Sequence, residues 1–198
     1  MIFTGRPNAG KSTIIRKIVG LNAATGKLPG TTRRITKYPL SRGLVLVDMP
    51  GFGRMMRTSK RLQEKINDQI IKFLESNAQN VALATHVLDI STFLEVTWRL
   101  ERKGFISLDV EMVQFLAETS GEFPIVAANK IDKTDKEDLE ANLEEFTYRI
   151  SKGQTSAVAD HVFPISAKTG EGSGSLKSAI HQELVAKGFR TPFRMIRQ

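Results

Sequence analysis

The feature that most constrains this chain is a glycine-rich segment near its start. Positions 5 to 12 are Gly-Arg-Pro-Asn-Ala-Gly-Lys-Ser, which matches the pattern of a phosphate-binding loop. Such a loop connects a strand to a helix, and here it lies between a predicted strand over 1–4 and a predicted helix over 11–19. A chance match is expected in about one chain in a hundred of this length. The sequence therefore predicts a site for the phosphates of a nucleotide.

The chemistry of such a loop comes from its backbone and from two side chains. Successive N–H groups converge on the phosphates at a helix N-terminus. Lys11 would reach the outer phosphates, and the Ser12 hydroxyl would ligate Mg²⁺. The residues predicted to bind the nucleotide here are Gly5, Arg6, Pro7, Asn8, Ala9, Gly10, Lys11, Ser12 and Thr13.

Short apolar runs alternate with longer amphipathic stretches along the rest of the chain, a pattern typical of βαβ units and a mostly parallel sheet. Strands are predicted over 1–4, 35–40, 44–48, 81–89, 123–129 and 162–165. Helices are predicted over 11–19, 60–76, 109–119, 136–151 and 174–187, the third with Asp109 as its N-cap. Segment 91–108 is hard to classify and indicates a short helix plus a loop. The chain has no internal repeat or linker, so we expect one α/β domain over 1–198.

A second motif, Asp48-Met49-Pro50-Gly51, closes a predicted strand. There the Asp48 carboxylate could hold the Mg²⁺ shell while the Gly51 N–H faces the terminal phosphate, with Pro50 between them. Alone this motif is weak, because Asp, Pro and Gly are ordinary turn residues. Its meaning depends on the loop upstream.

Two further motifs predict base recognition. Asn129-Lys130-Ile131-Asp132 follows an apolar strand, and the Asp132 carboxylate could accept hydrogen bonds from the ring N–H and the exocyclic amine of guanine. Adenine cannot satisfy that carboxylate, and a buried acceptor without donors costs about 1–3 kcal/mol. After the last strand, the Ala167 N–H could bind the guanine carbonyl while its neighbours brace Asp132. The predicted base-binding residues are Asn129, Lys130, Asp132, Ser166, Ala167 and Lys168.

The four motifs gain weight from their order. Each follows a predicted strand, and open α/β sheets bind ligands at the carboxyl ends of their strands. A solvated turn would explain any one of them alone, but the joint chance is well under about one in a thousand. A P-loop nucleotide kinase would lack the motif at 129–132. The sequence thus predicts a protein that binds GTP or GDP with Mg²⁺ and hydrolyses GTP.

The set of motifs resembles the translation-factor-type GTPases, the superfamily that includes Ras and Era, over essentially the whole chain. Segments 5–12, 29–33 (Pro-Gly-Thr-Thr-Arg) and 48–53 (Asp-Met-Pro-Gly-Phe-Gly) are similar to the EngB (YihA/YsxC) family, particularly its archaeal branch. Segment 109–115, with Trp98 and Arg99 upstream, is also similar to that branch. The resemblance implies a three-layer P-loop GTPase fold, the Ras-like G domain, with a mostly parallel six-stranded sheet and helices on both faces.

The resemblance also assigns roles. It implies that Thr32 coordinates Mg²⁺ and senses the terminal phosphate, with Gly30 and Thr31 beside the nucleotide, and that 54–60 is a second switch. It implies that family members act in large ribosomal subunit assembly and in cell division. The residues implied to act in hydrolysis are Lys11, Thr32 and Gly51, and the implied Mg²⁺ ligands are Ser12, Thr32 and Asp48.

One position departs from the Ras pattern. Phe52 stands where that group places a water-orienting Gln, and its side chain cannot hydrogen-bond. Related GTPases with a hydrophobic residue there commonly carry the Asn equivalent to Asn8 and use K⁺ as the positive charge that an arginine finger would supply. Such a finger is worth about 10³ to 10⁵ in turnover. We therefore expect slow intrinsic hydrolysis, stimulated by K⁺ and by the assembled partner.

The charge of the chain is concentrated in one region. The formal net charge is +8, and residues 27–61 contain nine Lys and Arg residues against the single acid Asp48, so the remainder is neutral. Four more basic residues and no acid occur from Lys187 onward. Some of these charges could face a bound triphosphate, but nine exceed that need, so we favour a polyanionic partner. We expect ribosomal RNA or the large ribosomal subunit, no DNA, and a monomer.

Other features exclude classes of protein or site. The chain has no cysteine, which excludes disulfides and thiolate metal sites, and no apolar run approaches the 18 or so residues of a membrane span. With the first glycine motif at Gly5 we expect no signal peptide, no membrane partner and a cytoplasmic location. The three histidines lie apart in the sequence and indicate structural roles, so no metal beyond Mg²⁺ is expected. Trp98 could stack on a nucleic-acid base or pack on a helix of its own domain, and we favour packing.

Two alternatives to a switch in ribosome assembly stay open. One is a signalling or membrane-associated GTPase, such as the cytosolic module of an iron transporter, although the sequence has no membrane segment or lipidation motif. The other is a nucleotide-dependent binding module with negligible turnover, for which Phe52 is the main support.

Overall fold

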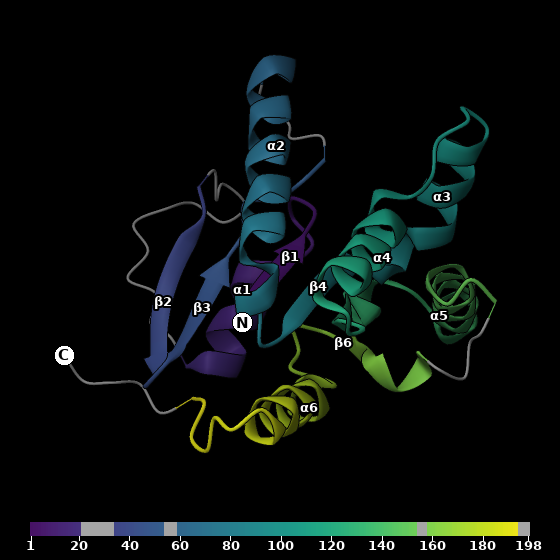
Figure 1. Ribbon diagram of the computed structural model, residues 1–198. Helices are drawn as coiled ribbons and strands as arrows, with labels where there is room; N and C mark the ends of the chain where they lie inside the picture. Colours follow the sequence, from purple (N-terminus) through teal and green to yellow (C-terminus); the bar gives the residue numbers. More distant parts are fainter. Residues whose placement is uncertain (21–33, 54–58, 154–157, 194–198) are drawn as a thin grey trace.

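The computed structural model describes residues 1–20, 34–53, 59–153 and 158–193, which form one open sheet with helices on both faces (Figure 1). The sheet is six-stranded, in the order β2-β3-β1-β4-β5-β6. Its strands are β1 (Ile2–Gly5), β2 (Thr36–Ser41), β3 (Leu44–Asp48), β4 (Ala84–Asp89), β5 (Ile125–Asn129) and β6 (Val162–Ile165). Every neighbouring pair is parallel except β2 and β3, which are antiparallel. The predicted mostly parallel six-stranded sheet is confirmed.

Helices cover the sheet on two sides because alternate residues of each strand point to opposite faces. Phe3 packs in an apolar cluster with α1 and α6, whereas its neighbour Ile2 packs in a second cluster with α2 and α4. A third cluster, which includes Val126, lies beneath α3, α4 and α5. The bounds of the helices are α1 (Lys11–Val19), α2 (Lys60–Asn77), α3 (Phe93–Glu101), α4 (Leu108–Ser120), α5 (Lys136–Ile150) and α6 (Ser173–Ala186). The predicted three-layer α/β fold is confirmed.

Helix α2 shows how local sequence sets an element. The Ser59 hydroxyl caps it by accepting a hydrogen bond from the Leu62 N–H at 3.3 Å, and Ile66, Ile70 and Leu74 are buried against the sheet, as their spacing predicts. The strand predicted over 81–89 begins only at Ala84, since a 3₁₀ turn follows the helix. None of the helices in the described part of the chain is long and apolar enough to cross a membrane.

Segment 91–108 holds α3 and a connecting loop, and α4 begins at its end. Ser107 occupies the N-cap position of α4, so the prediction that Asp109 caps this helix is wrong. The buried Asp109 carboxylate instead contacts His86 and Arg6, on other elements. Trp98 is 53% exposed and belongs to none of the three apolar clusters, so the packing that we favoured for it is also wrong.

Candidate nucleotide-binding site

The four motifs meet at one edge of the sheet. Gly5 ends β1, Asp48 ends β3, Asn129 ends β5, and Ser166 follows the last residue of β6. These strands run parallel, so their carboxyl ends lie on the same side. Contacts between motifs far apart in the sequence then build a single site.

The glycines of the first motif are required by close approach. A Cβ atom at Gly5 would lie 2.3 Å from the Val87 carbonyl oxygen, and one at Gly10 would lie 2.1 Å from the Asn129 amide nitrogen. Gly10 is the N-cap of α1, with a left-handed backbone and no side-chain cap. The backbone N–H groups of the first turn of α1, which includes Thr13, are thus suited to phosphate oxygens.

A buried ion pair joins the first motif to the second. Lys11 Nζ donates to Asp48 Oδ1, and the two side chains are only 6% and 7% exposed. Removing either partner would leave a buried charge without compensation. The second motif also packs directly on the loop, because a Cβ at Gly51 would lie 2.8 Å from the Pro7 nitrogen. The last residue of β3 and the turn after it therefore contact the predicted phosphate site, through an ion pair and through close packing.

Asn129 is the hydrogen-bonding centre of the base side. Its amide donates to the Ala9 carbonyl at 2.7 Å, and its carbonyl oxygen accepts from the Ala167 N–H at 2.8 Å. The fully buried side chain thereby connects three motifs. We expected the Ala167 N–H to bind a guanine carbonyl; here it bonds to Asn129, so guanine would have to share or replace that bond.

Asp132 is prepared as a hydrogen-bond acceptor. The Ser166 hydroxyl donates to Asp132 Oδ1 at 2.6 Å, and Lys168 Nζ lies 3.9 Å from the other carboxylate oxygen. The Ser166 hydrogen bond, opposed by desolvation and aided by a backbone bond and by Lys168 and Lys133, holds the pKa of Asp132 below its usual value. The carboxylate is therefore ionised at neutral pH, as pairing with guanine N–H groups requires.

Two predicted site residues have unusual backbones. Asn8 and Lys130 adopt φ angles of 65° and 74°, in the left-handed region that side chains other than glycine seldom occupy. Lys130 Nζ is paired with Asp89 Oδ2, and Ser91 donates to the same carboxyl group at 2.7 Å. Asp89 belongs to none of the predicted motifs, although it ends β4 as Asp48 ends β3.

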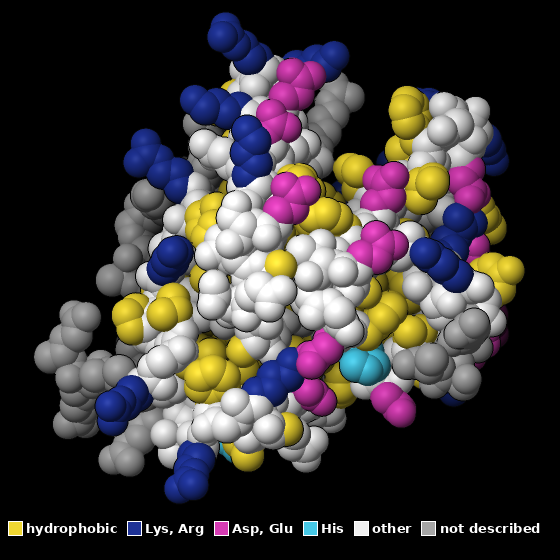
Figure 2. Space-filling view, viewed as in Figure 1, with side chains coloured by type: hydrophobic (Ala, Val, Ile, Leu, Met, Phe, Trp, Pro, Cys, Tyr) yellow, Lys and Arg dark blue, Asp and Glu magenta, His cyan; other side chains and the backbone are white. Residues whose placement is uncertain are grey.

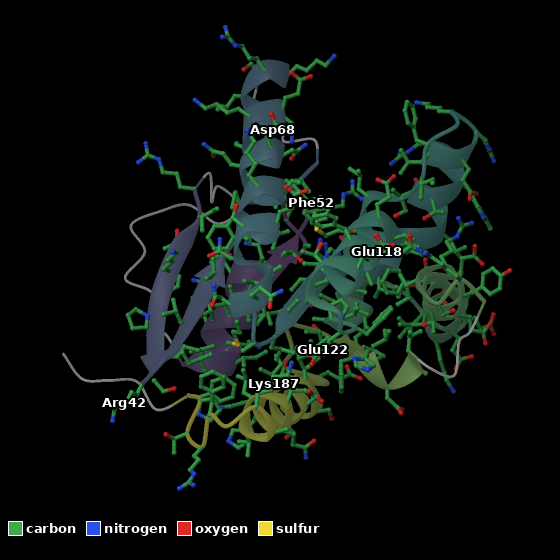
Figure 3. All side chains as sticks on the ribbon, in the orientation of Figure 1. Arg42, Phe52, Asp68, Glu118, Glu122 and Lys187 are labelled. Atoms are coloured by element: carbon green, nitrogen blue, oxygen red, sulfur yellow. The ribbon has the colours of Figure 1, made fainter. Side chains whose placement is uncertain are left out.

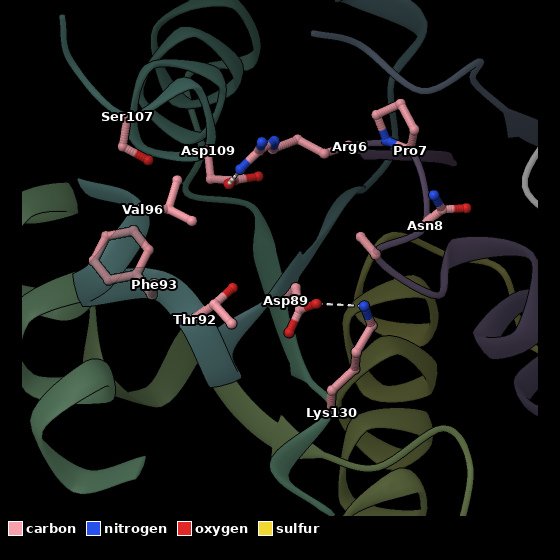
Figure 4. A pocket seen from close by; sticks show the side chains of 11 residues that line it. Arg6, Pro7, Asn8, Asp89, Thr92, Phe93, Val96, Ser107, Asp109 and Lys130 are labelled. Atoms are coloured by element: carbon pink, nitrogen blue, oxygen red, sulfur yellow. Dashed lines mark hydrogen bonds and ion pairs between the residues drawn. The ribbon is translucent and has the colours of Figure 1, made fainter. Parts of the chain in front are cut away.

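A cavity of about 160 Å³ lies between the first motif, Lys130 and the start of α3 and α4 (Figure 4). Arg6, Asp89, Asp109 and Lys130 supply its charged lining. Its other lining residues are Pro7, Asn8, Ala9, Thr92, Phe93, Val96 and Ser107.

A buried polar network that no sequence motif predicted connects the first motif to β4 and α4. His86 Nε2 lies 3.2 Å from Asp109 Oδ1, and Arg6 donates to the other oxygen at 3.5 Å. A carboxylate only accepts, so Nε2 carries a proton, and Nδ1 lies 3.0 Å from the Thr4 hydroxyl, which can serve as donor or acceptor. The structural role expected of His86 is confirmed, and its partner Asp109 lies 23 residues away.

Phe52 packs inward, as Figure 3 shows between α2 and α4. It is buried in the apolar cluster of those helices, with its ring centroid 5.7 Å from that of His86. Next to it, the Gly53 N–H donates to Asn67 of α2 at 3.3 Å. Gly30, Thr31, Thr32 and residues 54–58 of the predicted second switch lie outside the described residues.

An open sheet with these four motifs at its carboxyl edge defines a P-loop GTPase. A family model described as "50S ribosome-binding GTPase" matches residues 1–130. The "Probable GTP-binding protein EngB" of Methanopyrus kandleri is 40% identical over 192 residues, which cover 96% of this chain and 94% of that protein. The chain belongs to the EngB family and is therefore a GTP-binding protein that hydrolyses GTP.

Solved structures agree with this assignment. A crystal structure of "a probable GTP-binding protein engB" superposes with a TM-score of 0.79 at 36% identity and covers 93% of this chain and 98% of that one. Era, solved with MgGDPNP and a fragment of 16S ribosomal RNA, gives a TM-score of 0.60 at 22% identity, over 90% of this chain and 54% of that one. The likeness to Era concerns the fold alone.

Proposed function

We propose that this protein is a GTP-dependent switch in the assembly of the large ribosomal subunit, acting in the cytoplasm as a monomer with one G domain over 1–198. The observation that carries the proposal is the contact of Lys11 and Pro7 with Asp48 and Gly51, because it joins the phosphate site to the segment that leads into α2. The family model's description supports a ribosomal partner rather than DNA or a membrane.

A basic surface formed by α2 and the β2 edge supports an RNA partner. Lys and Arg side chains gather over α2 and the β2 edge (Figure 2). Lys37 of β2 is held 5.5 Å from the centre of the Phe73 ring of α2. Arg34, Arg42, Lys60 and Arg61 are the other described basic residues of the segment 27–61. Such a surface attracts the phosphates of RNA in a salt-dependent manner.

The donor set fits Mg²⁺ and a triphosphate. A buried carboxylate at Asp48 and a hydroxyl at Ser12 are hard oxygen ligands, and Thr32 would complete the set. When bound, Mg²⁺ supplies positive charge to the β- and γ-phosphate oxygens. Lys11 would then exchange its contact with Asp48 for the outer phosphates. The Gly51 N–H would bind the terminal phosphate. When hydrolysis removes that phosphate, the neighbouring residues Phe52 and Gly53 would be free to move.

The roles on the base side follow from the same geometry. Asn129, held by Ala9 and Ala167, positions the loops, and Asp132 chooses guanine. Lys130 lies between the two sides of the site, since it follows Asn129 and also lines the cavity beside the first motif. Asn8 is exposed, and its amide oxygen could bind a K⁺ ion beside the phosphates. The buried Phe52 side chain carries no charge and cannot take the place of that ion.

Sedimentation with purified large ribosomal subunits tests the proposal. The protein should co-sediment with a non-hydrolysable GTP analogue and be released with GDP. Association that ignores the nucleotide, or none at all, would contradict the proposal and favour a signalling GTPase. Repeating the experiment at increasing salt should weaken the association steeply if phosphate contacts contribute.

A further inference from the structure

The connection between α3 and α4 exposes an unusual amount of apolar surface. Trp98, Phe105, Ile106 and Leu108 are 53%, 62%, 60% and 39% exposed. They account for half of the eight large hydrophobic side chains that are exposed in the described part of the chain, although they come from eleven consecutive residues. We call residues 98–108 the α3–α4 tip. A concentration of this kind marks an interaction surface, whereas scattered single residues do not.

The backbone of the tip is ordered by its own hydrogen bonds. The Phe105 N–H donates to the Leu100 carbonyl at 3.0 Å, and the Gly104 N–H donates to the Glu101 carbonyl at 2.8 Å. Gly104 has a φ of 74°, which lets the chain turn there. The tip projects beyond the sheet at the upper right of Figure 1, with hydrophobic side chains at its surface in Figure 2. Trp98 is therefore exposed on the last turns of α3, and Phe105 is exposed on the hydrogen-bonded turn that follows.

The charges of the tip favour a polyanion. Three exposed basic residues, Arg99, Arg102 and Lys103, lie between the two aromatic residues in the sequence. The one acid of the tip, Glu101, pairs with Arg149 of α5 at 2.5 Å. Arg99 has only a long, exposed contact of 3.8 Å with Glu95, which is weak. Exposed aromatic rings interleaved with Arg and Lys are the combination that binds single-stranded nucleic acid, because bases stack on the rings and phosphates lie against the cations.

We propose that the α3–α4 tip is a docking surface for single-stranded RNA, with unpaired bases stacked on Trp98 and Phe105. This proposal rests on the proposed function, since a ribosomal subunit presents such RNA. It adds a second RNA contact, formed by the tip, to the basic surface of β2 and α2.

The base of the tip contacts the nucleotide site. A Cβ atom at Gly53 would lie 3.0 Å from Leu108 Cδ1, so Gly53, two residues after the second motif, packs against the first residue of α4. The next residue, Asp109, holds Arg6 of the phosphate loop. A change around Gly51 is thus expected to reach the tip, and RNA binding should differ between the GTP-analogue and GDP forms.

The tip can be tested directly because Trp98 is the only tryptophan of the chain. We would titrate the full chain, loaded with a GTP analogue or with GDP, with 12-nucleotide single-stranded oligo(U) and oligo(A) RNA and record tryptophan fluorescence. Stacking on Trp98 should quench the emission. Phe105→Leu keeps an apolar side chain but removes the ring, and should weaken binding about 5- to 150-fold.

A matched control is Tyr148→Leu, which removes a ring that is 59% exposed on α5 and is not part of the tip. Its RNA affinity should equal that of the wild type. All variants should bind GTP normally, which shows that they fold. Absence of quenching, or equal RNA affinity of Phe105→Leu and the wild type, would overturn the proposal.

Sedimentation with ribosomal subunits separates this proposal from the proposed function. If the wild type and Trp98→Leu co-sediment equally with the GTP analogue, the tip proposal fails and the proposed function stands. If Trp98→Leu loses subunit binding although the wild type shows no affinity for the oligonucleotides, the tip binds a protein, and the RNA assignment fails. If the wild type does not co-sediment, the proposed function fails, and the fluorescence titration still decides the tip.

Discussion

The base side and the phosphate side of the candidate site are held together in different ways. On the base side, short hydrogen bonds through Asn129 and Ser166 connect the loops after β5 and β6. On the phosphate side, the buried pair of Lys11 and Asp48 and the close approach of Gly51 to Pro7 connect the motifs. The Ser166 bond to Asp132 can persist when guanine binds, because the carboxylate can accept further hydrogen bonds, whereas Lys11 would have to leave Asp48 to reach phosphate. In the proposed function, the base side is thus prepared before the ligand binds, and the phosphate side responds to the ligand.

The largest expected effect is on base choice. Asp132→Asn replaces a carboxylate that accepts twice by an amide that accepts once and donates once. Both hydrogen bonds from guanine to a charged group would be disturbed, so GTP affinity should fall about 10²- to 10⁴-fold. XTP, whose ring carries a carbonyl in place of the amine, should bind the variant better than GTP does.

Calorimetric titration with GTP, ATP and XTP measures this change. Asp135→Asn is the control, since Asp135 caps α5 through a bond from the Asp138 N–H and Asn caps a helix equally well. Unchanged GTP affinity in Asp132→Asn, or equal ATP and GTP affinity in the wild type, would refute the assigned base side.

The second prediction concerns the buried ion pair. Lys11→Met leaves the Asp48 carboxylate buried and unpaired, which should lower the free energy of unfolding by about 3–5 kcal/mol in nucleotide-free protein. Urea unfolding measures this loss. The double variant Lys11→Met with Asp48→Leu should recover most of it, and Lys17→Met, an exposed position on the same helix, should have little effect. If the double variant were no more stable than Lys11→Met, the pair would not be the cause.

The third prediction tests the proposed charge at Asn8. GTP turnover should be at least about tenfold faster in potassium than in sodium buffer, since a well-placed positive charge is worth up to about 10⁵. Asn8→Ala should remove the difference between the salts. Identical wild-type rates in both buffers would end the potassium hypothesis.

Two buried asparagines allow a structural role to be separated from a role in nucleotide binding. Asn129→Ala breaks two hydrogen bonds between elements, whereas Asn142→Ala breaks one to α3 and one within α5. Each variant should destabilise the fold by about 1–3 kcal/mol in thermal unfolding. Only Asn129→Ala should also weaken nucleotide binding, because Asn142 connects α5 to α3 away from the site. Equal nucleotide affinity of the two variants would show that Asn129 is merely structural.

The smallest expected effect is a change in titration. The pKa of Asp132 is lower in the folded protein than in the unfolded chain, where it is about 3.9. The ionised carboxylate therefore stabilises the fold above that unfolded-state pKa, and this stabilisation is lost as the pH falls through the folded-state pKa. Ser166→Ala removes the largest cause and should move the pKa of Asp132 upward. Carbon NMR of the Asp132 carboxyl group measures its pKa in the wild type and in Ser166→Ala. An equal pKa in the two proteins would contradict the role of the Ser166 hydroxyl.

Local sequence determined much of this protein. Each motif is a short run whose neighbours, an apolar strand before it and a turn or helix after it, fix its own backbone. Parallel strands then bring Gly5, Asp48, Asn129 and Ser166 to one edge without further information. For this reason the sheet and the location of the site were predictable from the residues themselves.

Only the tertiary structure decided which side chains meet behind that edge. Asp89 pairs with Lys130 across 41 residues, and Arg6 reaches Asp109 across 103. No local pattern encodes those distances, which is why Asp109 was mistaken for a helix cap and Asp89 was missed. The exposure of Trp98 was decided in the same way, since a side chain is buried only if another element packs on it, and α3 ends beyond the layers that could do so.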